Sequence, residues 1–276
     1  MTDISKAGAL RQKAKTVRRE VLKMIHKAKS GHPGGSLSAA DIMTVLYFNE
    51  LNVNPKKPDW NERDRFILSK GHVCPVLYTC LALCGYFAME QLGTLRVAGS
   101  ILQGHPDMKR CPGIDMSTGS LGQGASVGVG MALAAKRDGQ NLRVFVLVGD
   151  GETNEGQIWE AVQSAVKYKL SNFILIVDNN GLQNDGPCDE VMPTGDIAKK
   201  LAAFGMDVYE CNGHDMDALL DAFSSMRRSD YEGPRALVAK TVKGKGVSFM
   251  ENIVAWHGMA PNDAQLAAAL EEIGHD

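Results

Sequence analysis

Two continuously apolar runs, RVFVLVGD over 143–150 and FILIVDNN over 173–180, give the clearest signal in the hydrophobic pattern of this chain. Runs of this kind, rich in Val and Ile, are typical of strands buried on both faces of a parallel sheet. The pattern predicts a helix between them, over 155–169, because apolar residues recur there at helical spacing. A right-handed crossover through this helix brings the carboxyl ends of both strands to the same edge of one sheet.

The remaining pattern predicts further helices and strands. Helices are expected over 5–29, 38–48, 75–83, 123–137 and 215–228 and from Asp263 onward, short strands over 66–68, 207–210 and 235–242, and loops over 31–35, 52–64 and 97–124. Ser38, three residues before Asp41, is expected to cap the second of these helices. This order of elements is typical of an α/β fold with a mainly parallel sheet flanked by helices. No repeat, low-complexity tract or linker divides the chain, so we expect a single domain over 1–276.

Composition narrows the class of protein. The 276 residues are 44% hydrophobic, and 30 basic and 32 acidic residues give a formal net charge of −2 with no long run of either sign. This balance does not indicate a nucleic-acid or membrane surface. No apolar run reaches transmembrane length, and the polar start MTDISKAGALRQ does not resemble a signal peptide. The six cysteines lack zinc-site spacing and are expected to be reduced thiols, so we expect a cytoplasmic enzyme.

Polar residues follow both strands of the first predicted unit. Asp150 ends the first strand within Gly149-Asp150-Gly151, and Asn180 ends the second, thirty positions later. Parallel strands bind ligands at their carboxyl edge, so both side chains are expected at one crevice. A carboxylate and an amide oxygen suit Mg²⁺, which usually keeps phosphate oxygens in its shell. The flanking glycines let the backbone approach a diphosphate closely, and the helix that begins near Glu155 adds amide donors.

Other interpretations of this segment are weaker or excluded. An Asp-Gly pair after a strand is often only a turn, and the tripeptide alone does not decide between a turn and a binding site. An EF-hand is excluded because the spacing of its glycine and closing glutamate is not met. A dinucleotide site is excluded because no G-x-G-x-x-G follows either strand.

Several strings together resemble the transketolase family. GDG followed some thirty residues later by NN is the diphosphate and metal motif of thiamine-diphosphate enzymes, and GDGETNEGQIWEA…LSNFILIVDNNGLQNDG is similar to the transketolase branch. The other matching strings, in the order of the family and over nearly the whole chain, are SGHPGGSLSAADI (30–42), RDRFILSKGHVCPVLY (63–78), QGHPD (103–107), STGSLGQG (117–124) and WHG (256–258). The resemblance implies the thiamine-diphosphate-binding fold, in a domain of the diphosphate type.

The resemblance also implies roles for individual residues. The expected catalytic residues are His32 and His257, which would contact the reacting oxygens, and His105, near the two-carbon unit. The expected cofactor contacts are His72 and Gly151 by the diphosphate, Asn180, and Gly119 with Leu121 near the aminopyrimidine. The expected ligands of Mg²⁺ (or Ca²⁺ or Mn²⁺) are Asp150, Asn180 and the carbonyl of Leu182. Glu155 matches a glutamate of the contacts between paired active sites, although a solvated first-turn carboxylate is its simpler interpretation.

The resemblance covers only the N-terminal, diphosphate-binding half of a usual transketolase. Single-chain members are more than twice as long, and their second domain supplies the glutamate that activates the aminopyrimidine. Two explanations fit: a natural split enzyme with a separate second subunit, which we favour, and a truncated chain. We therefore expect a heterotetramer, with two copies of each chain, that transfers a ketol unit from a ketose phosphate to an aldose. The alternatives are another thiamine-diphosphate enzyme, including a split one for an unusual sugar, and a non-catalytic cofactor-binding or regulatory module.

Overall fold

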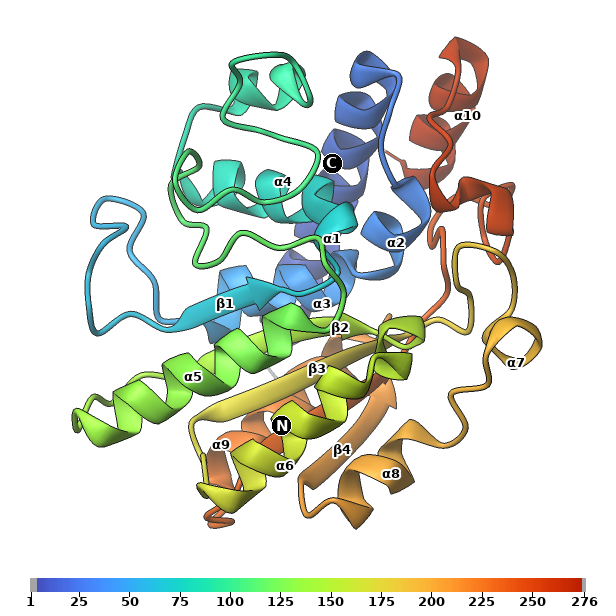
Figure 1. The fold of residues 1–276 in the computed structure, drawn as a ribbon. Helices are drawn as coiled ribbons and strands as arrows, with labels where there is room; N and C mark the ends of the chain where they lie inside the picture. Colours follow the sequence, from blue (N-terminus) through green and yellow to red (C-terminus); the bar gives the residue numbers. More distant parts are fainter. Residues whose placement is uncertain (1–3, 275–276) are drawn as a thin grey trace.

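A five-stranded parallel sheet forms the centre of the molecule (Figure 1). The computed structural model describes residues 4–274. The strands lie in the order β1-β2-β3-β5-β4, and every neighbouring pair is parallel. Their bounds are β1 Arg65–Leu68, β2 Val144–Gly149, β3 Phe173–Asn179, β4 Asp207–Asn212 and β5 Arg235–Lys240. All five predicted strands are therefore confirmed, and so is the α/β class with its mainly parallel sheet.

Helices cover both faces of this sheet, which accounts for the continuous apolar runs. Phe145 and Leu147 of β2 belong to the hydrophobic cluster on one face, whereas Val146 and Val148 belong to the cluster on the other. The first cluster is formed with α1 (Ile4–Ala28), α3 (Ala40–Val45), α4 (Cys74–Cys84), α9 (Met216–Arg228) and α10 (Asp263–Ile273), the second with α5 (Gln123–Arg137), α6 (Gly156–Lys167) and α8 (Ile197–Ala203). Burial on two faces removes the polar alternation that a half-exposed strand would show.

Most of the glycine-rich segment after α1 is helical, so the expectation of a loop over 31–35 holds for residues 31–32 and was wrong for 33–35. Helix α2 spans Pro33–Ser38, with proline at its first position. A Cβ atom at Gly35 would lie 2.5 Å from Val73 Cγ1, and one at Gly34 would lie 2.9 Å from the carbonyl oxygen of Trp256. These glycines therefore permit close packing of α2 rather than an irregular backbone.

Ser38 does not cap the next helix, which corrects a second expectation. Helix α3 begins at Ala40, has Ala39 at its N-cap position and continues into a π-helical turn over Leu46–Glu50. The Ser38 hydroxyl instead donates to the carboxylate of Asp178, at the end of β3. A tertiary contact has replaced the local one that the sequence suggested.

Several short elements escaped the sequence pattern. They are α7 (Cys188–Val191), α8, and 3-10 turns over Gly71–Val73, Met89–Thr94, Gly151–Asn154 and Val254–His257. The predicted loop over 97–124 is confirmed up to the start of α5. All six cysteines are free thiols, as expected.

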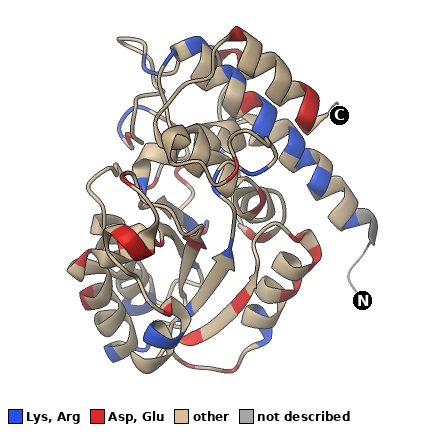
Figure 2. Cartoon of the chain, turned by 90° about the vertical axis from the view of Figure 1, so that its right-hand side faces the viewer, with Lys and Arg blue, Asp and Glu red and all other residues tan. Residues whose placement is uncertain are grey.

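The distribution of charged residues and the lengths of the helices agree with what the composition predicts. Basic and acidic residues are interspersed over the face shown in Figure 2. No helix in the described part of the chain is long and apolar enough to cross a membrane.

The packing of α5 on the sheet gives a stability prediction. A Cβ atom at Gly128 would lie 2.4 Å from Val146 Cγ2, whereas nothing lies within 4 Å of one at Gly130 in the same helix. We expect Gly128→Ala to lower the free energy of unfolding by about 1–3 kcal/mol through overpacking. Gly130→Ala should raise it by up to about 1 kcal/mol through helix propensity. Chemical denaturation measures both, and a Gly128→Ala chain as stable as the Gly130→Ala chain would contradict the packing argument.

Candidate active site

A cavity of about 300 Å³ opens at the carboxyl edge of the sheet, where β2 and β3 end. Eight of the residues to which the family resemblance gives a role line it: His72, Leu121, Asp150, Gly151, Glu155, Asn180, Leu182 and His257. They come from loops that follow β1, β2, β3 and β5 and from the segment before α5. The expected meeting of Asp150 and Asn180 at one crevice is thus found.

Asp150 is a buried carboxylate whose hydrogen bonds come from the backbone. Its side chain is held by the amides of Gly151, at 2.8 Å, and Gly181, at 2.5 Å. Burial raises the pKa of Asp150 and the nearby Asp178 carboxylate adds to this, whereas the two amide donors and Lys70 act in the opposite direction. A bound cation would stabilise the ionised form of such a group.

The oxygen donors beside Asp150 suit a hard cation. Asn180 and Leu182 line the same cavity, and Asn180 Oδ1 accepts a hydrogen bond from the Leu182 amide at 3.1 Å. Carboxylate, amide and carbonyl oxygens with room for phosphate oxygens form the donor set that Mg²⁺ prefers. No three His, Cys, Asp or Glu side chains within residues 4–274 are grouped to hold a metal ion by themselves. The donor set therefore fits a cation that is shared with a phosphorylated ligand.

Two lysines that were not predicted from the sequence bring positive charge to this cavity. Lys70 follows β1 and pairs with Asp178. Lys243 follows β5 and donates to the carbonyl oxygens of Leu182, at 3.1 Å, and Gln183, at 3.2 Å. Burial, followed by the charge of Lys70, lowers the pKa of Lys243 to about 8. The sequence did contain a signal for Lys70 and Lys243, because each lies two or three residues after a strand and directly before a glycine.

Asp178 connects the segments that surround the cavity. Its carboxylate is fully buried and accepts from Lys70, Ser38 and Thr241. Burial would raise its pKa, but Lys70 and these hydrogen bonds hold that pKa below its usual range. The ends of β1, α2, β3 and β5 are therefore joined by one charged group.

Glu152 performs a similar task on the other side of Asp150. Its carboxylate accepts from the Ser69 hydroxyl and from the amides of Gly122, at 2.9 Å, and Gly149, at 3.1 Å. Burial raises the pKa of Glu152, while these three donors partly offset that rise. Glu152 was not singled out from the sequence, because its role depends on three segments that meet only in the folded chain.

A buried network outside the cavity fixes the loop that carries Lys243. Arg18 of α1 donates to Asp41 of α3 at 2.9 and 2.5 Å, and His214 lies 2.8 Å from the same carboxylate through Nδ1. His214 Nε2 in turn accepts from the Val242 amide at 2.8 Å. Because Nε2 is the acceptor, the proton of a neutral His214 is on Nδ1, where it donates to Asp41.

Three of the four histidines selected from the sequence form one cluster. The ring centroid of His32 lies 5.1 Å from that of His72 and 5.5 Å from that of His257. The ring centroids of His72 and His257 lie 5.2 Å apart. Burial is the main cause that lowers their pKa values, to about 4 for His32, about 2 for His72 and about 3 for His257. All three rings are therefore neutral near pH 7.

Basic neighbours determine which ring nitrogen carries the proton. Lys243 Nζ lies 2.8 Å from His257 Nδ1, and Arg96 Nη2 lies 3.4 Å from His32 Nδ1. A charged ammonium or guanidinium can only donate, so Nδ1 accepts in both histidines and Nε2–H remains as a donor. His257 can therefore present an N–H donor to a polar ligand, whereas the His32 ring also hydrogen-bonds to the backbone of His72.

His105 and Gly119 lie together beside the cavity rather than in its wall. A Cβ atom at Gly119 would lie 3.0 Å from the His105 ring, and the φ of +144° at this position favours glycine. The charge of His105, when protonated, acts on His32, so the two rings are near each other. Burial and Arg96 lower the pKa of His105 as well.

Glu155 lies at the amino end of α6 as the sequence predicts. It occupies the N-cap position, its side chain makes no capping hydrogen bond, and the residue is exposed. It lines the cavity as part of the open wall. Both interpretations of Glu155, a contact between active sites and a solvated carboxylate, stay predictions.

The family model and the related sequences that match this chain all point to the same family. Residues 10–276 match the family described as transketolase, thiamine diphosphate binding domain. An apulose-4-phosphate transketolase subunit of Phocaeicola vulgatus is 44% identical over 93% of this chain and 90% of its own length. A 6-deoxy-6-sulfo-D-fructose transketolase subunit of a Clostridium species is 42% identical over 96% of both chains.

Solved structures agree with these relatives in fold. Transketolase from Leishmania mexicana superposes with a TM-score of 0.92 at 31% identity, over 97% of this chain and 41% of that chain. Transketolase from Campylobacter jejuni gives 0.91 at 35% identity, over 97% of this chain and 43% of that chain. The chain thus spans less than half the length of these solved transketolases, but nearly the whole length of the subunit relatives.

The buried Lys70–Asp178 pair gives a test of what holds the site together. Asp178→Asn keeps the shape of the side chain but leaves the Lys70 ammonium buried without its counter-charge. We expect the free energy of unfolding to fall by about 3–5 kcal/mol. Glu20→Gln, which breaks a surface pair with Lys23, is the control and should cost at most about 1 kcal/mol. Equal stabilities of the two variants in urea denaturation would refute the central role of Asp178.

Proposed function

This chain belongs to the transketolase family, as one subunit of a two-subunit ketol transferase, and we propose that it forms the diphosphate half of a two-chain active site. One observation carries the proposal. The chain contains a cavity with cation-ligand oxygens, two lysines and a histidine cluster, yet it matches only 40% of the length of single-chain human transketolase. The other half of the site is assigned to a separate partner subunit.

The residues around Asp150 fit the diphosphate end of thiamine diphosphate. We assign Asp150, Asn180 and the Leu182 carbonyl to Mg²⁺, or to Ca²⁺ or Mn²⁺ in its place. Lys70 and Lys243 add positive charge beside the phosphates. At Gly151 a Cβ atom would lie 2.8 Å from Cγ of Gln183, so glycine permits the close packing of this turn against the Gln183 side chain.

The histidines then act on the sugar. When bound, thiamine diphosphate supplies the carbon nucleophile and stabilises the two-carbon unit. The Nε2–H of His257 donates to an oxygen of the sugar as that oxygen gains negative charge, and His32, whose ring also hydrogen-bonds to the backbone of His72, contacts the reacting oxygens beside it. His72 contacts both of these rings and lines the same cavity as Asp150, and His105 with Gly119 borders the same region.

A partner subunit would complete the cavity. Leu121 and Met192 line it and are 37% and 57% exposed, so apolar side chains stand at its open side. A second chain that covers them would bury this surface and bring the glutamate that activates the aminopyrimidine. We propose a heterotetramer with two copies of each chain. We also propose a cytoplasmic enzyme, in keeping with six free thiols.

The substrate is proposed from the two subunit relatives. One is named for apulose-4-phosphate and the other for 6-deoxy-6-sulfo-D-fructose, which are both unusual sugars with an anionic group. We therefore propose a ketose of this class as donor and an aldose as acceptor. The histidine cluster favours catalysis over a purely regulatory role, because cofactor binding alone does not require sugar-facing donors.

The requirement for a partner is directly testable. With thiamine diphosphate and Mg²⁺, the purified chain alone should transfer no ketol unit from a ketose phosphate to an aldose. Addition of the cognate second subunit should produce activity that saturates as the subunits reach equal amounts. Full turnover by the single chain would disprove the split site, and an inactive but stable assembly would favour the regulatory alternative.

The pKa of His32 gives a prediction for the reconstituted enzyme. After burial, the charge of Arg96 is the largest cause that lowers the pKa of His32 to about 4. The neutral ring is therefore lost only at acid pH, and kcat/KM should show no His32 limb between pH 8 and 5. Arg96→Met removes the nearby charge, so the pKa of His32 rises and the acid limb moves toward neutral pH.

Arg110→Met serves as the control for this prediction. Arg110 is exposed in the same long loop region and is absent from the causes that set the pKa of His32. Its pH profile should match that of the unmodified enzyme. An acid limb that stays in place in Arg96→Met would show that His32 does not limit the reaction in its protonated form.

A further inference from the structure

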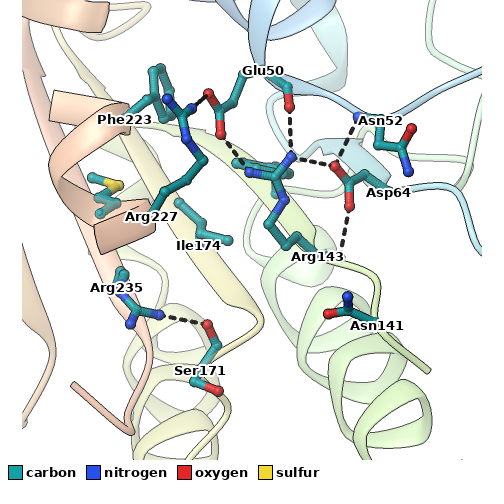
Figure 3. Close-up of a pocket in the computed structure, with 12 residues that line it drawn as sticks. Glu50, Asn52, Asp64, Asn141, Arg143, Ser171, Ile174, Phe223, Arg227 and Arg235 are labelled. Atoms are coloured by element: carbon teal, nitrogen blue, oxygen red, sulfur yellow. Dashed lines mark hydrogen bonds and ion pairs between the residues drawn. The ribbon is translucent and has the colours of Figure 1, made fainter. Parts of the chain in front are cut away.

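A second cavity lies at the opposite edge of the sheet. Its volume is about 470 Å³, and it opens where β2, β3 and β5 begin (Figure 3). Arg143 precedes β2, Ser171 precedes β3, and Arg235 is the first residue of β5. Within the described part of the chain, no residue lines both this cavity and the one at the carboxyl edge. The strands between them, at about 3.3 Å per residue, separate the two by roughly 20 Å.

The inner surface of this cavity is apolar. Phe145 and Ile174 come from the sheet, and Phe223 and Met226 come from α9. Each is at most 5% exposed. Ligand pockets commonly combine such a surface with a few polar groups that fix the orientation of the ligand.

The wall near α9 contains two arginines whose charges are already balanced. Arg143 donates to Glu50 at 2.5 Å and to Asp64 at 2.6 Å, and Arg227 also pairs with Glu50. The two guanidinium groups and two carboxylates form one network, drawn in Figure 3. This part of the wall is polar but close to neutral.

Arg235 has no such balance. It is 9% exposed, and its guanidinium donates only to the carbonyl oxygens of Ser171, at 2.7 Å, and Ser229 and Tyr231, both at 2.9 Å. Its Nε atom is buried without an acceptor, and no carboxylate in residues 4–274 forms an ion pair with it. A buried charge without a counter-ion is unfavourable, and an anion in the adjoining cavity would compensate it.

We propose that this cavity binds a small organic anion with an apolar body and one carboxylate, phosphate or sulfonate group. The anionic group lies at the arginine side, where guanidinium groups match planar and tetrahedral oxyanions. The apolar body packs against Ile174 and Met226, the more exposed of the four apolar side chains that line the cavity. This site is separate from the proposed active site and does not depend on the function assigned to it.

Calorimetric titration of the full chain tests the proposal. Thiamine diphosphate and Mg²⁺ are kept at saturation so that the carboxyl-edge cavity is filled. The probes are phenyl phosphate, benzoate and benzenesulfonate, with benzyl alcohol as the neutral analogue. We expect at least one anion to bind at one site per chain, and benzyl alcohol to bind at least tenfold more weakly.

Two variants assign the binding to this cavity. Asn141 is exposed at the cavity wall, so Asn141→Trp should fill the mouth and weaken the anion at least tenfold. Gln140→Trp is the matched control, because Gln140 is exposed and does not line the cavity. Arg227→Gln, at a side chain that is 46% exposed, leaves Glu50 with one cation fewer and makes this wall more negative, so it should weaken the anion several-fold and leave benzyl alcohol unchanged.

Three results would overturn the proposal. They are the lack of saturable binding by all three anions at millimolar concentration, equal affinity for benzyl alcohol, and unchanged anion affinity in both Asn141→Trp and Arg227→Gln. Circular dichroism melting of each variant establishes that it is folded. If Asn141→Trp does not fold, Arg227→Gln decides the outcome alone.

Discussion

The buried carboxylate of Asp178 holds the candidate site together. It stands at the end of the central strand β3 and binds Lys70, Ser38 and Thr241, which belong to three other segments. A carboxylate in such a place is tolerated only when it is paired and hydrogen-bonded. The same contacts therefore satisfy the charge and fix the end of β3, which leads to Asn180, against the ends of β1, α2 and β5. The contacts of Asp178 thus contribute both to the stability of the fold and to the geometry of the site.

Burial also sets the chemistry of the site. It keeps His32, His72 and His257 neutral, raises the pKa of Asp150 and lowers that of Lys243. A diphosphate with a cation would supply the missing counter-charges to Asp150 and Lys243, while in the neutral His32 and His257 the Nδ1 atom accepts from a basic neighbour and Nε2–H is the donor. The two ends of the sheet differ in this respect. At the amino edge, Arg235 forms no ion pair with a carboxylate of residues 4–274, and the inner surface of the adjoining cavity is apolar.

The strongest signals in the sequence were those with a local physical cause. β2 and β3 were predicted because both of their faces are buried, and this burial leaves a continuous apolar run. The expected loop at 31–35 was wrong for 33–35, because Gly34 and Gly35 permit close contacts of α2 with Trp256 and Val73, which no local pattern encodes. Ser38 was assigned to a cap for the same reason, since its true partner, Asp178, lies 140 positions away.

The α/β class, the strand-helix-strand unit and the meeting of the Asp150 and Asn180 oxygens at one edge could all be predicted from the chain, because strand direction and crossover handedness fix where strand ends meet. Motif strings also indicated the four loop histidines. The folded molecule was needed to show which of these histidines share a cluster, which ring nitrogens carry protons, and that Lys70, Lys243 and Glu152 belong to the site. These properties depend on burial and on contacts between distant segments. The sequence likewise did not predict the amino-edge cavity. Its arginines lie in separate segments of the chain, and only folding brings the starts of β2 and β5 and the end of α9 together.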